Sequence, residues 1–183
     1  MLAKPCYAFF ALSFAIAGLA IAADAPKDEV KLESLKFDAF TARLAQAGSK
    51  DFKYTLVDAW STTCGPCKEN FPHLVRMHKK LAGKGLQVVS LSLDDPSDTK
   101  ALEAARKFLV EQKAAFLNVL LDEEFGVGFD KLDINSIPAV FLYGPDGKLI
   151  KRFTMDDPKN QFTYEQVEKT VASLLEGKPV AAK

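Results

Sequence analysis

The sequence WSTTCGPCKENFP, residues 60–72, places Cys64 and Cys67 three positions apart at the start of a helical pattern. The residues before it, KYTLVDAW (53–60), form an apolar run rich in strand-forming residues and predict a buried strand. A strand that leads through a Cys-x-x-Cys turn into a helix allows three interpretations of the pair. The cysteines could bind a metal, form a structural disulfide or act as a reactive dithiol.

Length and charge favour one compact domain. The chain has 183 residues, of which 48% are hydrophobic, and this is enough for a single sizeable core. The 24 Lys and Arg residues balance the 24 Asp and Glu residues. We therefore expect a surface of mixed charge that does not bind nucleic acid. Separately, we expect the protein to be a monomer.

The first residues have the pattern of a secretory signal peptide (1–22). Lys4 precedes the apolar run YAFFALSFAIAGLAIA, and small residues allow cleavage after Ala22 or Ala25. The run is shorter than the about 20 apolar residues that a spanning helix needs, so we expect cleavage and export to the periplasm rather than a membrane anchor facing the periplasm. The rest of the chain divides into a linker (23–29), a domain (30–176) and a flexible tail (177–183).

The order of the predicted elements indicates an α/β domain with a mixed central sheet. Strands are expected at 30–35, 53–60, 86–93, 118–122 and on either side of the Gly-Pro-Asp-Gly turn in 137–153. Helices are expected from Phe37 to Gly48, at 66–82, at 99–113, as one turn around Phe129, and at 163–175.

A zinc site is not expected at the cysteine pair. His73 and His78 are the only histidines, and five positions along a helix set them about 140° apart, so both cannot reach one metal. We expect His73 to face solvent and His78 to lie where the helix meets the sheet. Haem attachment would need a histidine where Lys68 stands. No metal and no cofactor are predicted.

A structural disulfide is also a weak explanation. Cleavage of the signal peptide removes Cys6, and a bridge between the remaining two cysteines closes a loop too short to restrain the chain. A reactive dithiol fits better. Cys64 at a helix N-cap faces unpaired N–H groups, which lower the pKa of its thiol. Gly65 allows a tight bend, and Pro66 suits a first helical turn.

Two segments together resemble the thioredoxin superfamily, most closely its exported TlpA-like thiol-disulfide oxidoreductases. They are LVDAWSTTCGPCKENFPHL (56–74) and SIPAVFLYGPDGKLI (136–150). Besides the Cys-Gly-Pro-Cys motif, an acid, Asp58, precedes it by six residues, and Pro72 follows it by five. The resemblance covers 30–176 and implies a thioredoxin fold, a mixed central β-sheet flanked by helices on both faces.

The resemblance assigns catalytic roles to three residues. Cys64 would attack a substrate disulfide, and Cys67 would resolve the mixed disulfide. Asp58 would be a buried carboxylate with a raised pKa that takes the proton from Cys67, through water.

The resemblance also implies a substrate-binding groove. Ile137 and Pro138 would occupy the place of the family's cis-proline loop and line the groove beside Gly65 and Pro66, with Trp60 packed beside the disulfide. Two positions depart from the family pattern: Thr63 stands where many relatives have Trp, and Asn70 where many TlpA-like proteins have an acid.

The predicted function is a disulfide reductase for protein substrates, recharged by a membrane electron donor. Its role would be in cytochrome c maturation or in extracytoplasmic thiol homeostasis. One alternative is a thiol peroxidase, because Ser61 precedes Cys64 by three residues as in peroxiredoxin sites, although Val57 replaces the proline expected there. The other is a non-enzymatic binding module in which the pair senses redox state.

Overall fold

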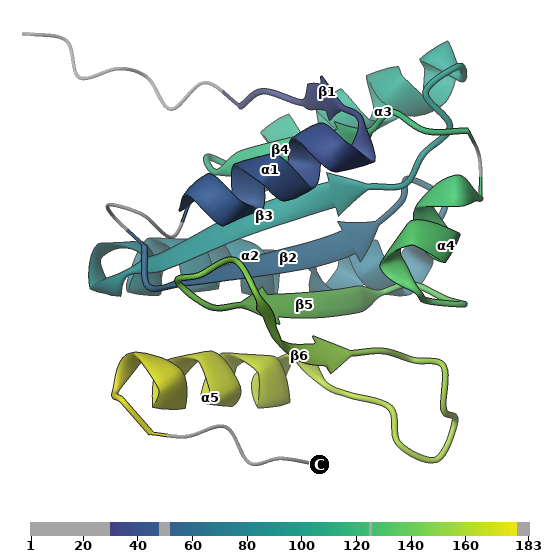
Figure 1. Cartoon of the computed structure of the whole chain (residues 1–183). Helices are drawn as coiled ribbons and strands as arrows, with labels where there is room; N and C mark the ends of the chain where they lie inside the picture. The colour runs from purple at the N-terminus through teal and green to yellow at the C-terminus, as the bar shows by residue number, and fades with distance from the viewer. Residues whose placement is uncertain (1–29, 48–51, 125, 179–183) are drawn as a thin grey trace, which may run out of the picture.

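The computed structural model describes residues 30–47, 52–124 and 126–178 as a single sheet with helices on both faces (Figure 1). The predicted signal peptide and linker, and residues 179–183 of the predicted tail, lie outside the described residues. In the part of the chain that is described, no helix is long and apolar enough to cross a membrane.

The sheet has six strands in the order β1-β4-β3-β2-β5-β6. The first four strands in this order run parallel, and β5 and β6 pair antiparallel at one side. The prediction of a mixed sheet is therefore confirmed. The strands are β1 (Glu33–Leu35), β2 (Tyr54–Trp60), β3 (Leu86–Ser92), β4 (Leu117–Leu121), β5 (Ala139–Tyr143) and β6 (Leu149–Phe153).

The helices cover both faces of the sheet, as expected for this fold class. One apolar cluster contains buried side chains of α2, α3 and α5, and a second contains those of α1 and the end of α4. A short 3-10 turn, η1 (Ala82–Lys84), follows α2. The helices are α1 (Phe37–Ala47), α2 (Gly65–Leu81), α3 (Thr99–Gln112), α4 (Val127–Leu132) and α5 (Tyr164–Leu175).

The central strand β2 carries the chain into the cysteine motif. Its side chains alternate between the two apolar clusters because successive residues of a strand point to opposite faces. Leu56 and Trp60 belong to the cluster under α2 and α5, whereas Val57 and Ala59 belong to the other. Asp58, between them in the alternation, therefore lies on the face that α2 and α5 cover.

The prediction that His73 faces solvent is wrong. Its side chain is only 17% exposed, and its Nδ1 lies 2.8 Å from Oε1 of Glu168 on α5. The sequence pattern of α2 alone could not show this, because α5 packs on a side of α2 that would otherwise be exposed. His78 contacts the ring of Phe116, with centroids 5.4 Å apart.

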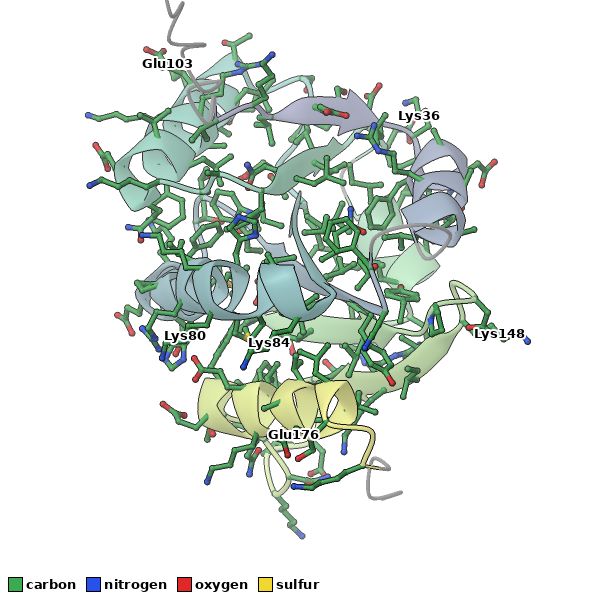
Figure 2. The ribbon with its side chains drawn as sticks, turned by 90° about the vertical axis from the view of Figure 1, so that its left-hand side faces the viewer. Lys36, Lys80, Lys84, Glu103, Lys148 and Glu176 are labelled. Carbon is green, nitrogen blue, oxygen red and sulfur yellow. A yellow bond between two sulfur atoms is a disulfide. The ribbon has the colours of Figure 1, made fainter. Side chains whose placement is uncertain are left out.

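Charged side chains of both signs lie around the outside of these layers (Figure 2). Lys80 lies in the last turn of α2, Lys84 is the last residue of η1, and Glu176 follows the end of α5. Lys36 and Lys148 lie on the right-hand side of this view.

Candidate active site

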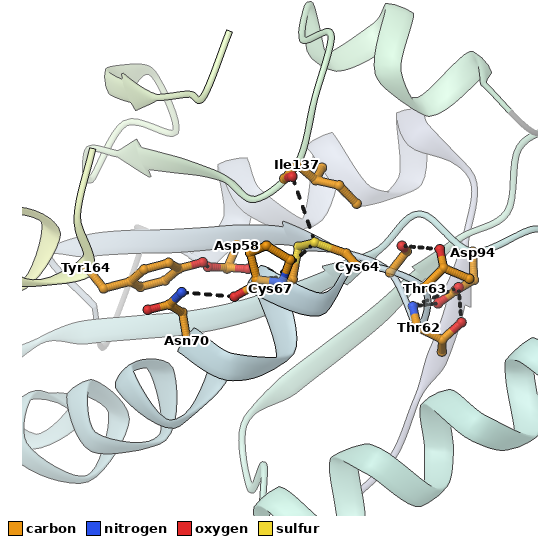
Figure 3. The surroundings of a disulfide bond; sticks show 11 residues. Asp58, Thr62, Thr63, Cys64, Cys67, Asn70, Asp94, Ile137 and Tyr164 are labelled. Atoms are coloured by element: carbon orange, nitrogen blue, oxygen red, sulfur yellow. Dashed lines mark hydrogen bonds between the residues drawn. A yellow bond between two sulfur atoms is a disulfide. The ribbon is translucent and has the colours of Figure 1, made fainter. Parts of the chain in front are cut away.

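Cys64 and Cys67 form a disulfide at the start of α2 (Figure 3). The two cysteines differ in exposure: Cys64 is partly exposed, whereas Cys67 is only 1% exposed and belongs to the apolar cluster under α2. An incoming sulfur can therefore reach only Cys64 without a rearrangement of the core.

The start of α2 positions the sulfur of Cys64. Cys64 is the N-cap residue, and its Sγ accepts a hydrogen bond of 3.2 Å from the backbone N–H of Cys67. Pro66 occupies the first turn, where its missing N–H leaves no helical hydrogen bond unmade. The N–H groups and the helix dipole favour negative charge on Cys64, so a thiolate is stabilised when the pair is reduced.

Asp58 is a buried acid in the middle of β2. Its side chain is 1% exposed, and burial raises its pKa to about 7, against a smaller opposing effect of a hydrogen bond from Tyr164. The Tyr164 hydroxyl donates to Oδ2 of Asp58 over 2.5 Å. A carboxyl that changes protonation near neutral pH can accept and return a proton under ordinary conditions.

A groove of about 520 Å³ opens beside Cys64. Gly65, Pro66 and Ile137 line it together with residues of the loop after β3. The carbonyl oxygen of Ile137 lies 3.8 Å from Sγ of Cys64, and the Ile137–Pro138 peptide bond is cis. A main-chain carbonyl beside the exposed sulfur offers an acceptor for the backbone of a bound chain.

One sequence-based assignment in the groove, that of Trp60, needs correction. Trp60 is fully buried against Phe71 and Phe108, outside the groove lining, so it supports the core and does not contact substrate directly. Gly65 has no positive φ, and a Cβ built there meets nothing within 4 Å. The bend at Gly65 therefore does not require glycine.

Sequence reasoning missed Asp94, which follows β3 and orders the loop before Cys64. Its carboxylate accepts hydrogen bonds from the backbone N–H of Thr62 at 2.9 Å, from the Thr62 hydroxyl at 2.6 Å and from the Ser92 hydroxyl at 2.7 Å. The available signal was its position, because the carboxyl ends of neighbouring parallel strands meet at one edge of a sheet. Tyr164 was also missed, and no local pattern marks it.

The two departures from the family pattern have local partners. The Thr63 hydroxyl lies 3.2 Å from that of Ser61, and Thr63 is exposed at the edge of the groove. The Asn70 side-chain amide donates to the carbonyl oxygen of Pro66 over 2.9 Å. Among the residues that the structure describes, no group of three or more His, Cys, Asp or Glu side chains could hold a metal ion.

Comparison with known proteins agrees with this arrangement. The chain matches the AhpC/TSA family over residues 21–152. It is 28% identical to the thiol-disulfide oxidoreductase ResA of Bacillus subtilis over 102 residues, which are 56% of this chain but only 53% of that protein. It is 26% identical to the thiol:disulfide interchange protein HelX of Rhodobacter capsulatus over 148 residues, 81% of this chain and 74% of HelX.

A solved structure has a similar fold, and its description matches the names of these relatives. The crystal structure of a putative thiol:disulfide interchange protein DsbE from Chlorobium tepidum superposes with a TM-score of 0.54 at 27% identity, over 69% of this chain and 82% of that one. The chain therefore belongs to the AhpC/TSA family, and its fold and cysteine pair are those of the thioredoxin-like thiol-disulfide oxidoreductases.

Proposed function

We propose that this protein is an exported disulfide reductase that acts, as a monomer, on protein substrates in the periplasm. Its work would be in cytochrome c maturation or in extracytoplasmic thiol homeostasis. The observation that carries the proposal is the unequal exposure of the Cys64–Cys67 pair at a helix N-cap beside an open groove. An exposed nucleophile with a buried resolving thiol is the arrangement that disulfide exchange needs.

The reaction transfers two electrons from the reduced pair to the substrate. The Cys64 thiolate attacks one substrate sulfur, so the substrate disulfide breaks, a mixed disulfide forms and one substrate thiolate leaves. Cys67 then gives its proton to Asp58 and attacks the Cys64 sulfur. The Cys64–Cys67 disulfide forms as the second substrate thiolate leaves, and the substrate is left fully reduced.

The Cys-Gly-Pro-Cys sequence supports the reducing direction, since thioredoxins with this motif have potentials near about −270 mV. The periplasm is kept oxidising, so a reductant there must be recharged. We infer that a membrane electron donor reduces the disulfide after each cycle.

The first test is the equilibrium reduction potential of the Cys64–Cys67 couple in glutathione and dithiothreitol buffers. A value near about −270 mV is expected for a reductant. A value near that of strong protein oxidants, about −120 mV, would mean that the protein donates disulfides instead.

The second test identifies the client. Replacing the resolving thiol in Cys67→Ser stops the reaction at the mixed disulfide, so client proteins should stay attached to Cys64 in extracts of the exported fraction. The double variant with Cys64→Ser is the matched control and should retain none. Recovery of the same proteins with the double variant would rule out capture through Cys64.

A thiol peroxidase is the second candidate, favoured by the family match and by Ser61. The Ser61 hydroxyl, however, pairs with Thr63, and Val57 stands where the peroxidase site needs proline. No arginine is among the described residues that line the groove beside Cys64. We expect negligible peroxide consumption; consumption at rates matching disulfide reduction would favour the peroxidase.

The third candidate is a non-enzymatic redox-sensing binding module. Unlike the reductase, it does not need Cys64 as a nucleophile. A binding module should keep its function in the Cys64→Ser variant, provided that the variant still folds. The reductase should lose all turnover of a disulfide substrate such as insulin.

A further inference from the structure

The hydrogen bond between Tyr164 and Asp58 joins two elements that are far apart in the sequence. Tyr164 is the first residue of α5, and its position is set by a capping box in which Thr163 and Gln166 exchange hydrogen bonds. Its ring packs against His73 and Phe162, so only its hydroxyl is directed at β2. Figure 3 shows the ring of Tyr164 extending toward Asp58.

Asp58 and Cys67 share the same layer of the molecule. Asp58 lies on the sheet face covered by α2 and α5, between Leu56 and Trp60 in the alternation of β2, and those two residues pack in one cluster with Cys67 and Tyr164. Tyr164 therefore contacts the carboxyl from the α5 side within the same buried layer as the resolving cysteine.

Few charged groups approach this carboxyl. Burial and the Tyr164 hydroxyl are the two causes that shift the pKa of Asp58. On α2, besides Cys67, the titratable side chain of His73 contacts the Tyr164 ring and pairs with Glu168 and Glu165 of α5. Arg76 of α2 also pairs with Glu168. These groups lie beyond the tyrosine ring, so the hydroxyl is the direct polar contact.

The hydroxyl opposes the effect of burial. Burial disfavours the carboxylate, whereas a donated hydrogen bond stabilises it. Burial and the carboxyl itself raise the pKa of Tyr164 above its usual range, so Tyr164 keeps its proton and remains a donor throughout the pH range of interest. Tyr164 is thus a donor that keeps its proton, and Asp58 is the acceptor whose protonation changes with pH.

We propose that Tyr164 is a positioning residue that sets the pH at which Asp58 exchanges its proton with Cys67, and through it the pH dependence of the Cys64–Cys67 couple. The proposal rests on the proton-accepting role given to Asp58 in the proposed function. The proposal means that the start of α5 influences the pH dependence of the couple, although this helix contributes no residue to the groove.

The test compares the wild type with Tyr164→Phe, which removes the hydroxyl and keeps the ring contacts. The reduction potential of the couple is measured across pH 5 to 9, and the ¹³Cγ resonance of Asp58 is followed over the same range. In the variant, the midpoint of the Asp58 titration should rise by about one to two pH units, and the inflection of the potential should rise with it.

Two variants serve as controls. Tyr143→Phe removes another tyrosine hydroxyl, from β5, whose ring packs against the apolar cluster on the other face of the sheet, and it should leave both midpoints unchanged. Asp58→Asn should abolish the Asp58 inflection. In the Asp58→Asn background, Tyr164→Phe should have no further effect on the pH dependence.

An unchanged Asp58 midpoint in Tyr164→Phe would overturn the proposal, and so would an equal effect of Tyr164→Phe with and without Asp58. If Tyr164→Phe does not fold, the wild type decides: the Tyr164 ¹³Cζ resonance should titrate with the same midpoint as Asp58, and a flat response would refute the coupling. The absolute potential tests the reductase direction separately, so an oxidising value with a shifted inflection would reject the proposed function and support the role of Tyr164.

Discussion

The Asp58 carboxyl is held where its charged form is costly. Burial raises its pKa from 3.8 to about 7, so below that pH the folded protein binds a proton that the unfolded chain releases above pH 4. A protein retains such a group only if other interactions offset the cost. Removing the charge should therefore stabilise the fold, and the gain should depend on pH.

For Asp58→Asn we expect greater stability above pH 7, by up to roughly 4 kcal/mol at about 1.4 kcal/mol per pKa unit. The sign follows from the raised pKa of Asp58. Below pH 4 its titration takes nothing from the free energy of unfolding of the wild type, and this free energy falls as pH rises from 3.8 to about 7. Urea unfolding of the oxidised proteins at pH 4 and pH 8 measures the difference. Equal gains at both pH values would contradict the raised pKa.

Gly65 is an exposed residue of the first turn of α2 with room for a side chain. Because its φ is not positive, alanine can adopt the same conformation while restricting the unfolded chain. Gly65→Ala should raise stability by about 0.4–1 kcal/mol, measured by thermal unfolding of the oxidised form. As a matched control, Gly85→Ala, at a φ of 101°, should be destabilising. A loss of stability in Gly65→Ala would mean that the turn is more restrictive than its geometry suggests.

The loop between β2 and α2 depends on one carboxylate from the end of β3. Asp94 satisfies the backbone N–H and the hydroxyl of Thr62 and the buried hydroxyl of Ser92. This contact links the strand beside β2 to the residues that present Cys64. The loop is thus held by a neighbouring element as well as by its own turn.

We expect Asp94→Ala to reduce stability by about 1–3 kcal/mol, because polar groups of Thr62 and Ser92 lose their partner. Reaction of reduced Cys64 with a model disulfide should also slow, since the loop loses its fixed position. Asp95→Ala is the control, because the hydrogen bonds of the Asp95 carboxylate are to Ser97 at the surface. Comparable losses in both variants would show that Asp94 has no special part in ordering the loop.

One buried amide connects β4 with β3 and with the segment before β1. The Asn118 side chain of β4 accepts from the Ser90 hydroxyl of β3 and donates to the carbonyl oxygens of Lys31, Ala114 and Phe116. It therefore ties the segment before β1 to the sheet. Replacing it affects how the whole sheet holds together, although it lies outside the groove beside Cys64.

Asn118→Ala should cost about 2–4 kcal/mol, because several buried polar groups lose their partners. The reduction potential should stay unchanged, since the change is remote from the disulfide. Ser34→Ala, an exposed change on β1, should have little effect on stability. A shifted potential in Asn118→Ala would mean that the β1 side of the sheet influences the redox site.

The sequence by itself determined the α/β class, the strand before the cysteines and the helix after them. These follow from local causes: hydrophobic periodicity, the Pro66 position and the cap at Cys64 are properties of neighbouring residues. The Cys-Gly-Pro-Cys spacing likewise singled out the two cysteines that form the disulfide. The boundaries of β2 and α2 differ from those predicted by a residue at most at each end.

Tertiary structure alone decided what surrounds the pair. The partner of Asp58 comes from α5, 106 residues later, and Asp94 comes from the loop after the neighbouring strand β3. The pattern of α2 predicts His73 in solvent because a helix pattern shows which side is apolar, but not which element covers the other side. Contacts between distant segments depend on how the layers pack, and this is a property of the folded chain rather than of any window of its sequence.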